Sequence, residues 1–206
     1  MSSFGEMTVN IADDLNRNDL DSQIGKAINR AISYYGFDRF WFNEKITTFA
    51  TVRSQESYGA ADGFPADILR LDTVNLTRNT TSKYLMVPKT YPWIVLVNPT
   101  ISLGPPTCYA IYEEQIFMYP NPDQSYTVTL SYVESYTELS DSNDTNNFLS
   151  NAEDLIESRA EWWLYSRVIR DADAASNCKN AELEALTALR RKTANYIGSG
   201  NMMWQE

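Results

Sequence analysis

The sequence predicts an α+β fold in which a helical bundle, built from the N- and C-terminal segments, carries an inserted antiparallel β-module. Apolar residues recur at helical spacing before residue 36, at a spacing of two within 45–136, and at helical spacing again after residue 151. Terminal helices of this kind can bury their apolar stripes only against each other. We therefore expect bundle halves at 1–44 and 151–198, the β-module at 45–136, a linker at 137–150 and a flexible tail at 199–206.

Two helices are expected in the N-terminal segment. Residues 8–16 predict a short helix that polar turn residues interrupt. Residues 20–35 predict a second helix, because Ile24, Ile28 and Ile32 follow one another at four-residue steps, and Gly36 is placed as its stop. The aromatic segment 37–44 follows, and we interpret it as filling a core rather than as a ligand platform.

The β-module is predicted from short runs with a period of two. Strands are expected at 45–53, 68–77 and 84–87, and a hairpin at 108–112 and 115–119 turns around Glu113 and Glu114. The alternation at 126–132 predicts a half-buried strand. Residues 91–97 stay open: their length and β-branching suit a strand, whereas Pro92 suits the first turn of a short helix.

Two further helices are expected after the linker. Ser150 and Glu153 have the spacing of a capping box, which predicts a helix that runs to about residue 170. A last helix is expected at 173–197, where Gly198 stops it. The basic residues near its end are favourable to the helix dipole.

The acidic residues are concentrated in one block. Between Lys89 and Arg159 there is no basic residue, and the ten acids there are Glu113, Glu114, Asp123, Glu134, Glu138, Asp141, Asp144, Glu153, Asp154 and Glu157. The rest of the chain balances, with 17 acids (27 − 10) against 17 bases, so this block accounts for the net charge of −10. A field of one sign repels phosphate and attracts basic surfaces. We expect 90–158 to lie on the surface of the β-module, with Glu113, Glu114, Asp123 and Glu134 as a candidate acidic surface; a solvated face that only aids solubility is the alternative.

Composition argues against several classes of function. The chain has no histidine, which removes the commonest general base and the commonest zinc ligand. Cys108 and Cys178 are far apart in the sequence, and no Gly-rich phosphate loop is visible. No stretch approaches the roughly 18 apolar residues of a membrane span. We therefore expect no enzyme activity, no catalytic, cofactor or metal residues, and no membrane partner.

Several short motifs, taken in order, resemble the head-to-tail adaptor (connector) proteins of tailed bacteriophages over nearly the whole chain. The elements that carry the resemblance are 28–31 (Ile-Asn-Arg-Ala), 39–44 (Arg-Phe-Trp-Phe-Asn-Glu) with 48–52, 64–68 (Phe-Pro-Ala-Asp-Ile), 104–106 (Gly-Pro-Pro) with 109–111, and 116–123 (Ile-Phe-Met-Tyr-Pro-Asn-Pro-Asp) followed by Tyr126. The segment 91–97 is more apolar than the polar turn or helix that the family has there.

The resemblance implies a structural protein without catalysis or cofactor. Such adaptors form a homo-oligomeric ring, usually of twelve copies, beneath the portal protein. The ring extends the DNA channel and offers a platform to downstream tail or nozzle proteins. This implies a protein that is made in the host cytoplasm and lies at the head–tail junction of the virion, where duplex DNA passes without tight binding.

The C-terminus holds the candidate portal or subunit docking residues. Arg190, Arg191 and Lys192 are the only dense basic cluster of the chain, and Met202, Met203 and Trp204 form an apolar tip after the Gly-Ser-Gly hinge 198–200. A tryptophan anchor with adaptable methionines suits a segment that orders on a partner. Folding of Trp204 back onto its own bundle is the equal alternative.

Two other functions compete with the adaptor. An aromatic β-module could bind carbohydrate, for example as a tail accessory module, which predicts a monomer with coplanar exposed rings. A glycosidase built on Glu113, Glu114 or Glu134 is a weaker alternative, because lone Glu pairs are usually solvated turns. The mass of the oligomer separates the adaptor from both.

Overall fold

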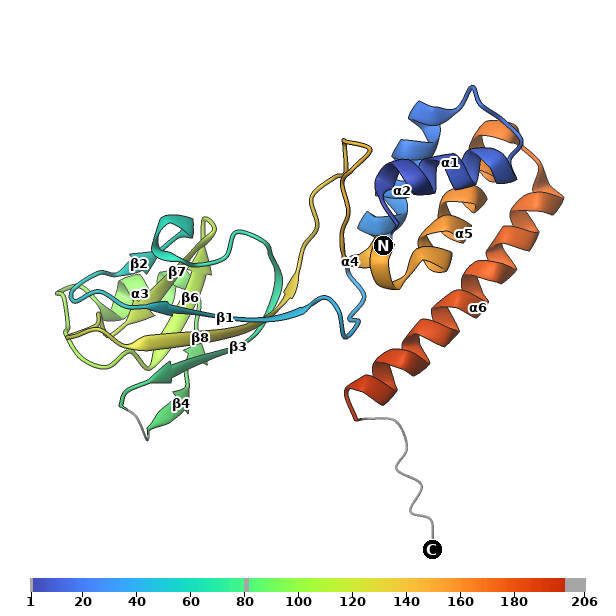
Figure 1. The fold of residues 1–206 in the computed structure, drawn as a ribbon. Coiled ribbons are helices and arrows are strands. Elements are labelled where there is room, and N and C mark those ends of the chain that lie inside the picture. Colours follow the sequence, from blue (N-terminus) through green and yellow to red (C-terminus); the bar gives the residue numbers. More distant parts are fainter. Residues whose placement is uncertain (1, 80–81, 199–206) are drawn as a thin grey trace, which may run out of the picture. The chain divides into compact units, whose positions relative to one another are not determined.

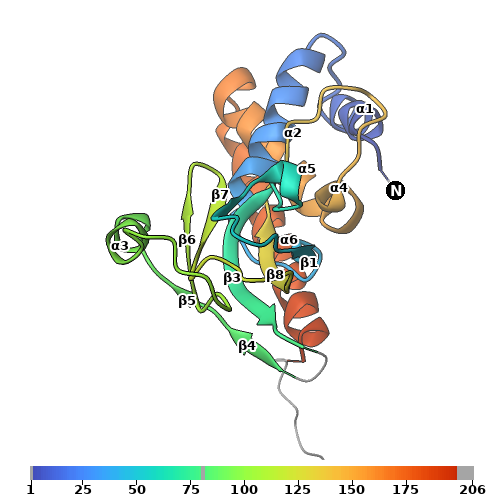
Figure 2. The same cartoon turned by 90° about the vertical axis from the view of Figure 1, so that its left-hand side faces the viewer.

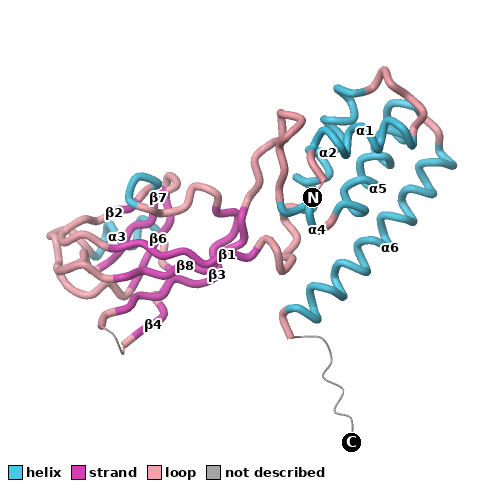
Figure 3. Tube along the Cα trace, in the orientation of Figure 1, coloured by secondary structure: helices cyan, strands magenta, loops and turns pink. Residues whose placement is uncertain are grey.

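The computed structural model describes residues 2–79 and 82–198 and confirms the α+β fold (Figure 1). The chain divides into two compact units, which we call the helical unit (1–43 and 136–206) and the β-unit (44–135). The helical unit contains α1 (Phe4–Asp14), α2 (Asp21–Tyr35), α4 (Asn147–Asn151), α5 (Glu153–Leu164), the π-helical turn Tyr165–Ile169 and α6 (Ala172–Tyr196). Strands occur only in the β-unit among the described residues (Figure 3).

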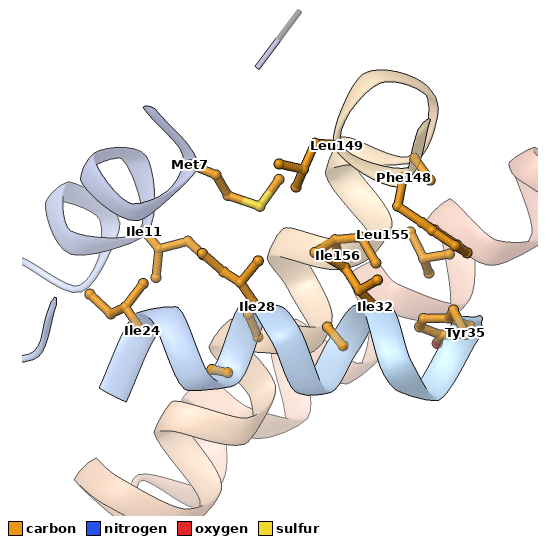
Figure 4. Close-up of a cluster of buried hydrophobic side chains, with 14 of the residues drawn as sticks. Met7, Ile11, Ile24, Ile28, Ile32, Tyr35, Phe148, Leu149, Leu155 and Ile156 are labelled. Carbon is orange, nitrogen blue, oxygen red and sulfur yellow. The ribbon is translucent and has the colours of Figure 1, made fainter. Parts of the chain in front are cut away.

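The helical unit has its own hydrophobic core. Met7 and Ile11 of α1, Ile28 of α2 and Ile156 of α5 are fully buried in one cluster (Figure 4). Trp163 and Leu186 pack against this cluster, which confirms the shared core that their helical spacing predicts. The helices α2 and α6 both pack on α5, so a stripe from each buries against the same central helix.

The first helix starts one turn earlier than the sequence pattern indicates. Ser3 is the N-cap of α1: its hydroxyl accepts from the amide of Glu6, and the Glu6 carboxylate accepts from the amide of Ser3. This reciprocal cap satisfies two amides that would otherwise lack helical partners. The helix therefore begins at Phe4 instead of residue 8.

The expected capping box at Ser150 and Glu153 is wrong. Ser150 lies inside α4, whose N-cap is Asn146, and α5 follows from Glu153 after Ala152 without a side-chain cap. The early start of α4 buries Phe148 and Leu149 in the core of the helical unit. The segment 137–150, expected as a linker, thus contributes core side chains and the start of a helix.

The β-unit consists of two four-stranded sheets. The first has the order β1 (Glu44–Ala50), β8 (Thr127–Glu134), β3 (Ile68–Thr77), β4 (Lys83–Leu85), and the second has the order β2 (Ser57–Tyr58), β7 (Gln115–Tyr119), β6 (Cys108–Tyr112), β5 (Val87–Pro88). The strands β3, β6 and β7 have the predicted bounds. Strand pairing is antiparallel except between β5 and β6, which are parallel. The two sheets enclose one cluster that includes Val74, Leu76, Val128 and Leu130.

The open segment 91–97 is a helix, α3 (Tyr91–Val97), with proline in its first turn. It packs on β6 and β7 (Figure 2). Its Tyr91 ring stacks on Tyr112 at 4.5 Å between centroids and meets Phe117 at 4.7 Å. Cross-strand pairing places Tyr112 and Phe117 on the sheet face opposite Ile116 and Met118, which lie in the core. The helix therefore covers the outer face of the second sheet.

Candidate assembly surfaces

The ten acids of the acidic block are divided between the two units. Only Glu113, Glu114, Asp123 and Glu134 belong to the β-unit, and the other six lie in the helical unit, which corrects the expected location. The Glu134 side chain is only 14% exposed and forms an ion pair with Lys45 of β1. Charge along the sequence could not reveal this pairing, because the two residues meet only through the β1–β8 ladder.

The tip of the β6–β7 hairpin carries two exposed glutamates. Glu113 and Glu114 have positive φ angles of 49° and 57°, in the left-handed region that asparagine and glycine occupy more readily. Tyr112 precedes them and is also exposed. Asp123 is exposed as well, but its carboxylate accepts a 2.5 Å hydrogen bond from the Tyr126 hydroxyl, which fixes it to its own turn.

The basic cluster lies on the exposed side of α6. Arg190 forms an ion pair with Asp38 at 3.3 Å, and the Lys192 ammonium lies 4.7 Å from the centroid of Trp41. Arg191 is exposed on the same helix. Tyr196, which is 74% exposed, and Ile197 add apolar surface nearby. Met202, Met203 and Trp204 lie outside the described residues.

The outer face of the first sheet is uncharged in its central part. Alternate residues of three adjacent strands share this face because their neighbours in sequence lie in the core. Across the strands, Thr48 lies opposite Thr129 and Thr129 opposite Asn75; the rows on either side contain Ile46, Ser131 and Thr73, and Ala50, Thr127 and Thr77. Within these rows the face offers hydroxyl and amide groups but no ionised side chain.

A buried ionic cluster joins three helices of the helical unit, and the sequence analysis missed it. The Glu182 side chain of α6 is 2% exposed; it accepts from Arg159 at 3.2 Å, from Lys179 at 2.8 Å and from the Tyr35 hydroxyl. Burial first, and then the hydrogen bond to Glu182, raises the pKa of Tyr35. The Arg159 guanidinium also lies over the rings of Tyr34 and Trp162.

The position of Glu182 could have revealed its role. It lies seven residues before Leu189 and seven after Ala175, which are both buried, so it is on the apolar side of α6. A glutamate there needs a cationic partner, because an unpaired buried carboxylate is costly.

A second group of ionisable side chains lies on α5 and α6. Burial and the neighbouring carboxylates, of which Glu161 is the largest influence, raise the pKa of Glu157 to about 7. Burial also raises the pKa of Glu161. The Cys178 thiol donates to Glu161 at 3.5 Å, and burial with this carboxylate raises the thiol pKa to about 12. A thiol in this setting stays protonated and is a poor nucleophile.

The described part of the chain shows no grouping of three or more His, Cys, Asp or Glu side chains that could hold a metal ion. Within 2–79 and 82–198, no helix has the length and apolar character needed to cross a bilayer.

The helical unit and the β-unit have separate cores, and they expose opposite charges at the tip of the β6–β7 hairpin and on α6. The family model for the SU10 adaptor protein matches residues 2–203, and the chain belongs to this family of phage adaptor proteins. The match confirms the resemblance to head-to-tail adaptors that the sequence motifs indicate. No match was found among curated proteins. Membership in the family makes the chain a virion component that associates with portal and tail proteins.

Proposed function

We propose that this chain is a non-enzymatic head-to-tail adaptor that forms a homo-oligomeric ring beneath the portal, extends the DNA channel and provides a platform for tail or nozzle proteins. The family match over residues 2–203 carries the proposal, because it includes both the helical unit and the β-unit. Twelve copies are the number that the resemblance to connector proteins implies.

The charge of the chain supports a channel through which DNA moves without being held. Tight DNA binding needs Lys and Arg side chains that neutralise phosphates and release counterions. The chain has a net charge of −10, and the central rows on the outer face of the first sheet contain no basic side chain. A wall of this kind gives passing duplex DNA little salt-dependent affinity.

The carbohydrate-binding alternative gains no specific support. It requires exposed, coplanar rings on which a sugar can stack. In the β-unit, the Tyr91 ring is stacked on Tyr112, and Trp93 packs edge-on near Tyr119 at 6.0 Å. These rings hold α3 on the second sheet, so they serve the packing of the unit.

The experiment is a mass measurement of the purified chain, alone and with the portal protein of the same phage, by native mass spectrometry with electron microscopy of the products. We expect a closed ring of identical copies that binds the portal. A chain that stays monomeric at micromolar concentration, both alone and with the portal protein, would rule out the proposed function.

A further inference from the structure

The β-unit exposes apolar side chains on α3 and two glutamates at the tip of the β6–β7 hairpin. Val95 and Leu96 of α3 are exposed, Leu96 to 76%, although Ile94 of the same helix is fully buried. The Tyr91–Tyr112 stack ties this helix to the end of β6, and Glu113 and Glu114 follow directly. We call Val95, Leu96, Tyr112, Glu113 and Glu114 the α3–hairpin face.

The negative charge of this face comes from Glu113 and Glu114 alone. No acidic residue occurs between Asp72 and Glu113, so α3 and the strands β4, β5 and β6 carry none. Exposed apolar side chains bordered by charge are typical of protein interaction sites. A partner surface for this face needs apolar side chains next to positive charge.

The helical unit contains a surface with these properties. Near its C-terminal end, α6 exposes Arg190, Arg191 and Lys192, and Tyr196 and Ile197 lie exposed beside them. We call these five residues the basic end of α6. It combines positive charge with accessible apolar groups.

We propose that the α3–hairpin face of one copy docks on the basic end of α6 of a second copy, an inference that rests on the proposed ring. Contact between two identical faces would bring glutamates against glutamates or arginines against arginines, and such like-charge contacts are costly. Contact between the two different surfaces pairs Glu113 and Glu114 with Arg190 and Arg191 and covers the apolar side chains of both. A head-to-tail contact of this type is the one that closes identical subunits into a ring.

The test uses two charge-reversed variants, E113K/E114K and R190E/R191E, each with the full chain. Each variant alone should need at least about tenfold more protein than the unchanged chain to form rings, because like charges then face each other. A 1:1 mixture should recover ring formation, since every contact in an alternating ring then joins opposite charges. The variant with all four substitutions should form rings on its own.

The controls carry the same charge changes at exposed positions outside the two surfaces: E56K/E138K and R53E/R167E. Both should assemble like the unchanged chain. Circular dichroism of every variant separates loss of assembly from loss of fold. As an independent measurement, E114C/R191C in a chain with serine at positions 108 and 178 should give a ladder of disulfide-linked oligomers under mild oxidation.

Three results would overturn the inference. The first is assembly of both reversed variants at the concentration of the unchanged chain. The second is recovery in the fourfold variant but not in the mixture, which would place the contact within one chain. The third is a cysteine variant that yields only monomers. Failure of the unchanged chain to form rings, with or without the portal, would instead remove the proposed function itself.

Discussion

Replacing Arg159 with leucine should destabilise the helical unit by about 3 kcal/mol. The change removes the guanidinium that lies 3.2 Å from the buried Glu182 carboxylate, and a lost hydrogen bond to a charged group costs about 1.5–3 kcal/mol. It also removes two contacts with the rings of Tyr34 and Trp162, each worth about 0.5–1 kcal/mol. In the variant, Lys179 still pairs with the Glu182 carboxylate at 2.8 Å. The loss in unfolding free energy therefore stays in the lower part of the range of about 3–5 kcal/mol that is typical of a broken buried ion pair.

The assay is urea unfolding followed by the far-UV circular dichroism of the helices, which reports on the helical unit. The double variant R159L/E182L should cost less than the sum of the two single changes by at least about 1 kcal/mol, because it removes both charges together. The matched control is R17L, which breaks the exposed Arg17–Asp19 pair and should leave the urea midpoint nearly unchanged, because surface ion pairs contribute little to stability. A loss below about 1 kcal/mol in R159L, or additive single changes, would refute the buried-pair argument.

Four further outcomes follow from the structure. I28A should lower the stability of the helical unit by about 2–5 kcal/mol in the same unfolding assay, because Ile28 is fully buried. Glu157 binds a proton more readily in the folded chain, so its contribution to stability falls as pH rises from about 4.5 to about 7; E157Q should therefore melt above the unchanged chain at pH 8 and together with it at pH 4. E113N/E114G should raise the melting temperature of the β-unit by relieving a left-handed turn that costs about 1–2 kcal/mol per residue, yet weaken ring formation. The unchanged chain should not shift duplex DNA on a gel at physiological salt and sub-micromolar protein, and a salt-dependent shift would contradict this.

The secondary structure is predicted best where the local sequence patterns agree with one another. The strand β3 and the hairpin β6–β7 have their predicted bounds, since alternation and turn residues agree there. The segment 91–97 could not be decided, because β-branched residues and Pro92 favour different structures and packing on β6 and β7 settles the choice. The cap at Ser150 failed because a second cap, Asn146, starts a helix that buries Phe148.

The roles of the charged side chains were predicted less well than the secondary structure, because they depend on partners that are distant in sequence. The Lys45–Glu134 pair joins residues of β1 and β8, and the Arg159–Glu182 pair joins α5 and α6. Neither pair has a local signature, so a count of acids along the chain treats Glu134 as surface and gives Glu182 no role. The exposed glutamates at 113 and 114 are the members of the predicted acidic surface that remain available to a partner.

The hairpin tip and the end of α6 differ in how their charges are held, and this difference bears on their docking. At the tip, the glutamates adopt left-handed backbone conformations that would cost asparagine or glycine less free energy. Such a disagreement between residue type and backbone conformation is common at functional sites. On α6, the partners Asp38 and Trp41 already orient Arg190 and Lys192. Side chains that are ordered before association lose less entropy when they bind. A short, fixed acidic turn meeting pre-oriented bases would therefore give a contact whose geometry is set before the ring forms.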